Sequence, residues 1–381
     1  MMDYSSRAPE YRSEYRRVRN AVKGAVSSQS ERGSEAGYVR ALDGVRGVAV
    51  GLVFLFHLRV AGFGAGYLGV DMFFVLSGFL ITSLVLDELR RTGRIALTSF
   101  WARRVRRLLP ALVLLLLVVA LVTWLTATFS ERATLRGDLL AATAYVANWH
   151  FISTSGYFVS TGIESPLQHT WSLAIEEQFY LIWPLLLTAL VLVVKRPRIA
   201  VGVLAALGVA GSAALLATQW SPGAVERAYM GTDSRIFEPL LGALGAVLVA
   251  HPRSRPVVDR LGGSLILLGA AGLIVGLIVI RPDTAVYYYG GALGVSAATL
   301  LLVAPLWLGH GRALRRALEW APLVWLGAIS YGVYLWHWPM TIWLGVRQTR
   351  GLEAGIRGAA VVLCTVGAAA ISYYAIERPI R

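Results

Sequence analysis

An arginine and a histidine enclose ten residues without a polar side chain in the stretch Arg46-Gly-Val-Ala-Val-Gly-Leu-Val-Phe-Leu-Phe-His57. This combination of an apolar run and two ionisable residues indicates both the kind of protein and the place of its functional site. At about 100° per residue, a helix brings His57 to about 20° from Arg46, on the same face and about 16 Å further along. An ionisable side chain in hydrocarbon is costly and normally faces a protein interior or a wet cavity, so it indicates a functional site. The alternative is a histidine that only hydrogen-bonds a neighbouring helix.

Composition places this stretch in a membrane protein. The 381 residues are 56% hydrophobic and 15% charged, and the mean hydropathy is +0.60, which soluble domains of this size do not show. The net charge of +14 does not indicate a nucleic-acid partner, because most arginines lie in short segments between apolar runs, where they orient helices. The single cysteine, Cys364, excludes an intrachain disulfide and a thiolate metal cluster, and we expect no bound metal.

Ten apolar runs are long enough to cross a hydrocarbon core of ~30 Å. They cover residues 42–62, 68–86, 108–128, 171–194, 199–218, 235–250, 262–280, 286–308, 322–345 and 356–376. A shorter run at 139–151 ends in Asn148-Trp149-His150, and we expect a re-entrant or interfacial helix there. The sequence therefore predicts an all-α polytopic membrane protein, with a disordered cytoplasmic tail at residues 1–38 and a transmembrane domain at residues 39–381.

Basic residues set the expected orientation of these spans. With both termini in the cytoplasm, 26 lysines and arginines lie inside and nine outside, as the positive-inside rule requires. Treating 139–151 as a further span would turn the last eleven inside charges outward. We therefore expect ten spans and two cytoplasmic termini.

The densest basic segment, Trp101-Ala-Arg-Arg-Val-Arg-Arg-Leu-Leu-Pro110, follows the second span. Its arginines are Arg103, Arg104, Arg106 and Arg107. Spacings of i,i+3 and i,i+4 would place guanidinium groups on one helix face, where their forked donors suit a phosphorylated ligand such as coenzyme A. The alternative is a positive-inside anchor.

Polar residues also gather at the predicted outer side. Asp71 lies near the outer end of the second span, where a helix dipole would stabilise its carboxylate whether or not it binds substrate. Ser172 and Glu176 share a helix face at i,i+4. His57 and Glu176 each lie about five residues from the outer end of their predicted helices, so each is a natural partner for the other.

Two further groups of polar residues lie near that level. Asp233 and Arg235 precede an apolar run, and an N-cap by Asp233 explains them about as well as a substrate role. Ser330, Tyr334 and His337 follow the spacing i, i+4, i+7, which makes a polar stripe on one helix face.

These segments together resemble the membrane-bound acyltransferase-3 family over about Tyr38 to Arg381. The similar motifs are Arg46-x10-His57, Asp71-x-Phe-Phe-x-x-Ser77-Gly, Arg103 to Pro110, His169-x-Trp-Ser172-Leu-x-x-Glu176-Glu177-Gln-Phe-Tyr180, Asp233-x-Arg235, Ser330-Tyr331-Gly-x-Tyr334-Leu-x-His337-x-Pro339 and Glu377-Arg-Pro379. The resemblance adds Ser77, Ser172, Glu177 and Tyr331 to the candidate substrate-binding residues named above.

The resemblance implies a bacterial cytoplasmic-membrane enzyme that transfers an acyl group, often acetyl, from cytosolic acyl-CoA to a hydroxyl of a polysaccharide or related glycan. The histidine of the first signature, His57, would be the essential catalytic residue. Many relatives continue into an extracytoplasmic esterase-like domain, which we expect this chain to lack. Either a separate extracytoplasmic transferase then completes the reaction, or this domain acylates its acceptor directly.

The expected chemistry is general-base catalysis. Histidine, with an ordinary pKa of about 6.5, suits removal of the acceptor proton at neutral pH. Glu176 would orient His57 as a carboxylate does in a catalytic triad, and Arg46 would hold a donor phosphate or the thioester oxygen. The alternative functions are a transporter or flippase, for which the sequence lacks the usual repeated halves, and a structural scaffold, which would not need buried histidines and glutamates.

Overall fold

The structure is a computed structural model that describes residues 39–154, 164–222, 225–281 and 284–380. The chain divides into two units, Met1–Arg40 and Ala41–Arg381, and the helical bundle belongs to the second. The predicted disordered tail at residues 1–38 lies outside the described residues.

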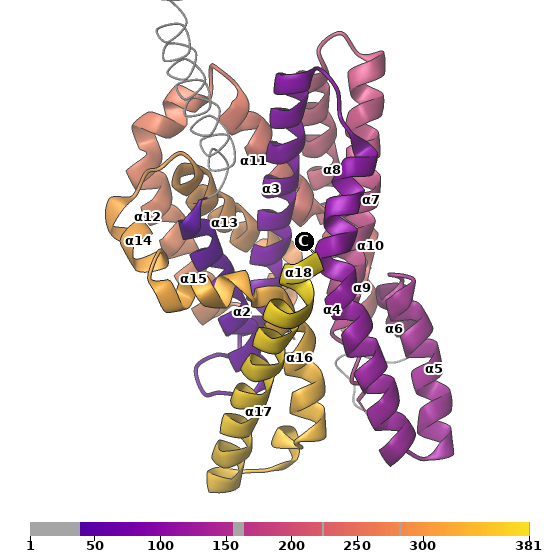
Figure 1. The fold of residues 1–381 in the computed structure, drawn as a ribbon. Helices are drawn as coiled ribbons and strands as arrows, with labels where there is room; N and C mark the ends of the chain where they lie inside the picture. The colour runs from indigo at the N-terminus through magenta and orange to yellow at the C-terminus, as the bar shows by residue number, and fades with distance from the viewer. Residues whose placement is uncertain (1–38, 155–163, 223–224, 282–283, 381) are drawn as a thin grey trace, which may run out of the picture. The chain divides into compact units, whose positions relative to one another are not determined.

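All regular elements of the described ranges are helical (Figure 1). In chain order they are α2 Arg40–His57, η1 Gly66–Leu68, α3 Gly69–Thr92, α4 Leu97–Thr126, α5 Phe129–Thr143, α6 Ala147–Thr154, α7 Thr170–Val193, α8 Pro197–Gln219, α9 Glu226–Met230, α10 Thr232–Arg235, α11 Phe237–Ala250, α12 Arg255–Val279, η2 Tyr287–Gly291, α13 Ala292–Trp307, α14 Arg312–Leu318, α15 Ala321–Ala328, α16 Ser330–Trp343, η3 Val346–Gln348, α17 Gly351–Ile371, η4 Ser372–Glu377 and α18 Arg378–Ile380.

Seven helical segments within the described residues are long and apolar enough to cross a membrane. They are Gly66–Thr92, Leu97–Thr126, Thr170–Val193, Pro197–Gln219, Arg255–Val279, Tyr287–Trp307 and Gly351–Ile380. The prediction of an all-α polytopic membrane protein is confirmed, and the other three predicted runs form shorter or broken helices.

The first predicted run ends earlier than expected. Helix α2 stops at His57, and the following loop contains Arg59 at φ 55° and Gly62 at φ 87°. Backbone in this left-handed region cannot continue a right-handed helix. His57 is therefore the last residue of its helix, and its predicted position five residues inside the helix is wrong.

The predicted runs at 235–250 and 322–345 are both divided. Ile236 separates α10 from α11, which has only 14 residues, and Ile329 separates α15 from α16. The expected single short helix at 139–151 is instead the end of α5, a turn and the start of α6. Tyr145 in that turn has a φ of 54°, which breaks the helix.

Helix α11 packs directly against α3 and α8. A Cβ atom added to Gly78 of α3 would lie 1.9 Å from the carbonyl oxygen of Pro239, and one added to Gly242 of α11 would lie 2.1 Å from that of Val75. Glycines at both positions let the two backbones touch, as small residues do between membrane helices. Enclosure by its neighbours explains why so short a helix is almost entirely apolar.

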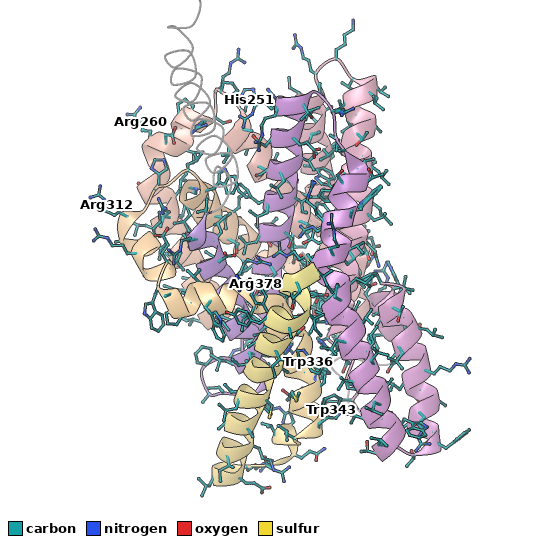
Figure 2. All side chains as sticks on the ribbon, in the orientation of Figure 1. His251, Arg260, Arg312, Trp336, Trp343 and Arg378 are labelled. Atoms are coloured by element: carbon teal, nitrogen blue, oxygen red, sulfur yellow. The ribbon has the colours of Figure 1, made fainter. Side chains whose placement is uncertain are left out.

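The connections between helices gather at two ends of the bundle. Figure 1 shows the α3–α4 and α7–α8 connections at one end and the α4–α5 and α16–α17 connections at the other. In Figure 2, His251 in the α11–α12 connection and Arg260 in the second turn of α12 lie toward the first end, and Trp343 lies toward the second. Three connections predicted to face the cytoplasm, α3–α4, α7–α8 and α11–α12, thus lie toward one end of the bundle, whereas Arg312 and Arg378 lie nearer its middle in this view.

Candidate active site

A pair of histidines joins the first described helix to the late helix α16. His57 Nδ1 lies 3.1 Å from His337 Nε2, and the ring centroids are 4.9 Å apart. His337 Nδ1 lies 2.6 Å from the carbonyl oxygen of Tyr334. His57 is 6% exposed and His337 only 1%. The structure therefore brings together two histidines that are both candidates from the sequence but whose pairing the sequence does not predict.

The predicted pairing of His57 with Glu176 is wrong. Glu176 Oε1 instead accepts hydrogen bonds from the hydroxyls of Ser77 and Tyr180. The reason is depth, because His57 ends α2, whereas Glu176 lies in the second turn of α7. Glu176 is therefore tied to α3 and to its own helix, and His337 takes the predicted place of its carboxylate.

Glu176 lines a pocket in which cations outnumber anions. The pocket is lined by Arg46, Val70, Phe73, Phe74, Arg104, Arg107, Leu108, Ser172, Leu173, Glu176, Tyr180, Ser330, Tyr331 and Tyr334. Three guanidinium groups, one from α2 and two from α4, thus share this space with a single carboxylate. Such a pocket favours an anionic group of a ligand, and guanidinium forks match phosphate and carboxylate oxygens.

The arginines of the predicted cluster lie on different faces of α4. Arg103, Arg104 and Arg107 line a second cleft, between the end of α3 and the start of α4, so Arg104 and Arg107 border both spaces. Arg106 is exposed and its Nε donates to the carbonyl of Ala102. Because two residues advance a helix by about 200°, Arg106 faces away from Arg104. Arg106 lines neither of these two spaces, so the substrate-binding role expected for it stays a prediction.

Residues at the start of α7 position the polar stripe of α16. The hydroxyls of Ser172 and Tyr334 are 2.6 Å apart, and the Tyr334 hydroxyl donates to the carbonyl of His169 at 3.2 Å. The ring of His169 packs edge-on against His337 at 5.5 Å. Both predicted residues, Ser172 and Tyr334, line the cationic pocket.

Two other motif residues have different surroundings. The Tyr331 hydroxyl donates to the carbonyl of Leu108 at 3.1 Å, and its ring lines the cationic pocket. Glu177 follows Glu176 in sequence but is not among the residues that line this pocket. The structure therefore groups Tyr331 with the candidate site, and Glu177 lies beside the site without lining the pocket.

Asp71 and Arg235 form a separate buried cluster. Arg235 Nη2 lies 3.1 Å from Glu238 and 3.5 Å from Asp71. The hydroxyl of Tyr287 donates to Asp71 at 2.9 Å. All four residues are fully buried, and none lines the cationic pocket. This cluster therefore connects α3, α10, α11 and η2. Neither Asp71 nor Arg235 has an exposed surface at which the predicted substrate binding could take place.

Asp233 is not the N-cap of α10 and does not line the cationic pocket, so its substrate role stays a prediction. Gly231 occupies the N-cap position of α10, without a side-chain cap, and Asp233 accepts two hydrogen bonds from Arg227 at 2.7 and 2.8 Å. These hydrogen bonds hold the pKa of Asp233 below its ordinary value. Asp233 is part of an ion pair at the surface, beside the buried cluster of its neighbour Arg235.

Sequence reasoning missed several partners. The motif from His169 to Tyr180 does not by itself indicate a role for Tyr180, whose hydroxyl donates to Glu176. Glu238 follows Arg235 by three residues, a spacing that indicates an ion pair on one helix face. The amide of Gln178 donates to that of Asn148 at 3.1 Å, in a partly buried contact between α7 and α6. No group of three or more histidine, cysteine or acidic side chains within the described ranges is arranged to hold a metal ion.

Comparisons with known proteins identify a family and several relatives of this chain. The acyltransferase-3 family, described as an acyltransferase domain, matches residues 39–376. Similar proteins include the peptidoglycan O-acetyltransferase OatA of Listeria monocytogenes, 36% identical over 90% of this chain and 56% of the relative. The putative peptidoglycan O-acetyltransferase YrhL of Bacillus subtilis is 37% identical over 90% of this chain and 55% of its own length.

The O-acetyltransferase OatA of Staphylococcus aureus is 36% identical over 90% of this chain and 57% of its own length. The chain thus spans about half the length of the curated relatives it matches. No solved structure matches significantly. Because the family match covers nearly all of the described helical bundle, the chain is a multi-pass membrane protein that belongs to the acyltransferase-3 family.

Proposed function

We propose that this protein transfers an acetyl group from acetyl-CoA to a hydroxyl of a cell-envelope glycan, with His57 as the general base. The observation that carries the proposal is the His57–His337 hydrogen bond at 3.1 Å, in a bundle that also encloses a pocket with three arginines. The relatives are named as peptidoglycan O-acetyltransferases, so peptidoglycan is the first acceptor to test.

The arginines of α4 suit the phosphates of the donor. Arg104 and Arg107 border both the cleft at the start of α4 and the cationic pocket, so a phosphorylated ligand in the cleft would have its acyl arm directed inward. Hydrogen bonds between guanidinium and phosphate are among the strongest in proteins. Arg46 lies further inside, where a cation would stabilise the negative charge that develops on the thioester oxygen.

The reaction itself needs one base and one proton carrier. The acceptor hydroxyl oxygen attacks the thioester carbonyl carbon while its proton moves to His57. A C–O bond forms, the C–S bond breaks, and His57 returns the proton to the sulfur of coenzyme A. Histidine performs both steps near neutral pH because its ordinary pKa is close to the working pH.

The donor-binding end of the bundle faces the cytoplasm in this proposal, as the positive-inside rule requires. A single cysteine introduced near Arg198, in a Cys364→Ser background because Cys364 is exposed, should resist an impermeant maleimide in intact cells. It should react once the membrane is opened. Labelling in intact cells would place the α7–α8 connection outside and overturn this orientation.

Transfer of radiolabelled acetyl from acetyl-CoA to purified peptidoglycan fragments tests the function. The purified protein in lipid nanodiscs should label the fragments, and His57→Ala should lose about 10² to 10⁴ in rate, as general bases do. A thermal unfolding curve should show that the variant remains folded, because His57 ends its helix and forms no ion pair with any residue that the structure describes. A His57→Ala protein that transfers acetyl within a fewfold of the parent rate would contradict the proposal.

A further inference from the structure

The hydrogen bonds of the two histidines determine which of their ring nitrogens carry a proton. His337 Nδ1 lies 2.6 Å from the Tyr334 carbonyl oxygen, which only accepts hydrogen bonds, so this nitrogen carries a proton. In a neutral imidazole the other nitrogen then holds the lone pair. His337 Nε2 is therefore an acceptor, and the nitrogen that donates to it across 3.1 Å is His57 Nδ1. His57 is left with its lone pair on Nε2.

The surroundings favour neutral rings for both histidines. His337 is 1% exposed and its ring is enclosed by the rings of Phe54, Tyr334 and His169. A buried cation without an anionic partner is costly, and neither histidine forms an ion pair with a carboxylate in the described residues. With both rings neutral, His337 Nε2 accepts the hydrogen bond and His57 Nδ1 donates it.

Burial also separates the roles of the two side chains. His57 keeps 6% of its surface exposed and is held between His337 and the ring of Trp338, whose centroid lies 4.9 Å from its own. Trp338 is itself fixed by a hydrogen bond from its Nε1 to the carbonyl of Ser165 at 2.8 Å. His337 lies deeper, so a substrate atom at His57 would not touch it.

We infer that His337 is a positioning residue that fixes His57 in the tautomer with its lone pair on Nε2, and that the Tyr334 carbonyl fixes His337 in turn. This relay of a carbonyl and an imidazole takes the place of the carboxylate in a triad, where the partner of Nδ1–H holds the reactive ring in the correct tautomer. The inference rests on the proposed function of His57 as base. It predicts that the reactive nitrogen is Nε2.

Kinetics of two variants test the relay. His337→Ala removes the imidazole that accepts from His57 Nδ1–H, while the hydrogen bond of the His57 ring with the Val53 backbone remains. We expect kcat to fall by about ten- to a hundredfold, the size of loss found when a partner that orients a metal-liganding histidine is removed. The KM for acetyl-CoA should stay within about twofold, because His337 lines neither arginine-bordered space. His337→Gln places an amide oxygen near the former Nε2 and should restore most of the rate. His310→Ala, which removes a surface histidine paired with Asp259, is the control and should match the parent.

A chemical rescue separates tautomer control from packing. Nδ-methylhistidine introduced at position 57 fixes the lone pair on Nε2 without any partner. In the His337→Ala background, where the methyl group has room, it should recover at least tenfold in kcat over His337→Ala alone. A packing role for His337 predicts no recovery.

A spectroscopic measurement makes the test independent of activity. In protein labelled with ¹⁵N-histidine, assigned through His57→Ala, the His57 Nε2 signal should be that of an unprotonated ring nitrogen, and His337→Ala should mix the two tautomers. Unchanged tautomers together with a parent-like kcat in His337→Ala would overturn the relay. The proposed function would fail separately, through an active His57→Ala.

Discussion

The molecule contains two buried polar centres, and the polar side chains are stabilised differently in each. In the first, the rings of His57 and His337 are joined by one hydrogen bond, and His57 retains a small exposed surface. In the second, Arg235 lies against two carboxylates and four aromatic rings and has no exposed surface. In the first centre a nitrogen lone pair remains available to accept a proton, whereas in the second centre the opposite charges pair with one another.

This difference separates a candidate catalytic centre from a structural one. A buried charge that is paired is weak evidence for stability, but removal of one partner is strongly destabilising because the other charge is left buried alone. A neutral hydrogen bond between rings carries a smaller penalty when broken. Variants at the two centres should therefore fail in different ways, one in folding and the other in turnover.

The largest expected effect belongs to Arg235. Arg235→Leu leaves the carboxylates of Asp71 and Glu238 buried without a cation, which should destabilise the protein by about 3–5 kcal/mol. The measurement is the thermal unfolding midpoint and the folded fraction of detergent-purified protein by size-exclusion chromatography. We expect little folded protein.

Arg227→Leu is the matched control for Arg235→Leu. It removes an arginine–aspartate pair from the same short segment, but the side chains of Arg227 and Asp233 are 37% and 38% exposed. Exposed pairs contribute under about 1 kcal/mol, so this variant should remain folded and active. Equal losses of stability in the two variants would remove the distinction between the centres.

Part of this arrangement could be predicted from the sequence. The eleven-residue spacing that puts Arg46 and His57 on one face, and the stripe of Ser330, Tyr334 and His337, both depend only on helical periodicity. The pairing of His57 with His337 depends on how two helices meet that are separated by 280 residues. No local pattern contains that information, so the nearest apparent partner, Glu176, was predicted instead.

The depth of His57 could not be predicted for a related reason. Hydrophobicity continues past His57 through Leu58, Val60 and Ala61, which suggests a longer helix. Positive φ angles at Arg59 and Gly62 end the helix instead. Likewise the apolar run at 235–250 reflects enclosure by α3 and α8, because a fully enclosed helix is apolar on all sides whatever its length.

An intermediate effect is expected at the arginines of α4. The double variant Arg104→Gln with Arg107→Gln removes two charges that border both the cleft and the cationic pocket. Hydrogen bonds to charged groups contribute about 1.5–3 kcal/mol each, so the KM for acetyl-CoA should rise by about tenfold or more, with a smaller change in kcat. Steady-state kinetics in nanodiscs measure both.

Arg106→Gln removes the same kind of charge from the exposed face of the same helix and serves as the control. Its KM should match the parent. If both variants lowered only the amount of protein in the membrane and neither raised KM, these arginines would serve as a positive-inside anchor and not as a donor site.

The smallest expected effect is that of Glu176→Gln, and it decides between the predicted and the observed partner of His57. Glutamine keeps an oxygen that accepts from Ser77 and Tyr180, so the contacts between α3 and α7 should survive. Only the charge among the pocket arginines is lost, and we expect kcat to change by about threefold, less than the ~1.4 kcal/mol that a tenfold change represents. Because His337 and not Glu176 contacts His57, the pH dependence of kcat should coincide with that of the parent. A full pH–rate profile of both proteins is the measurement, since it reports the titration of the essential base. A profile displaced to lower pH would mean that the carboxylate stabilises the His57 imidazolium after all, and that these two residues come together during catalysis.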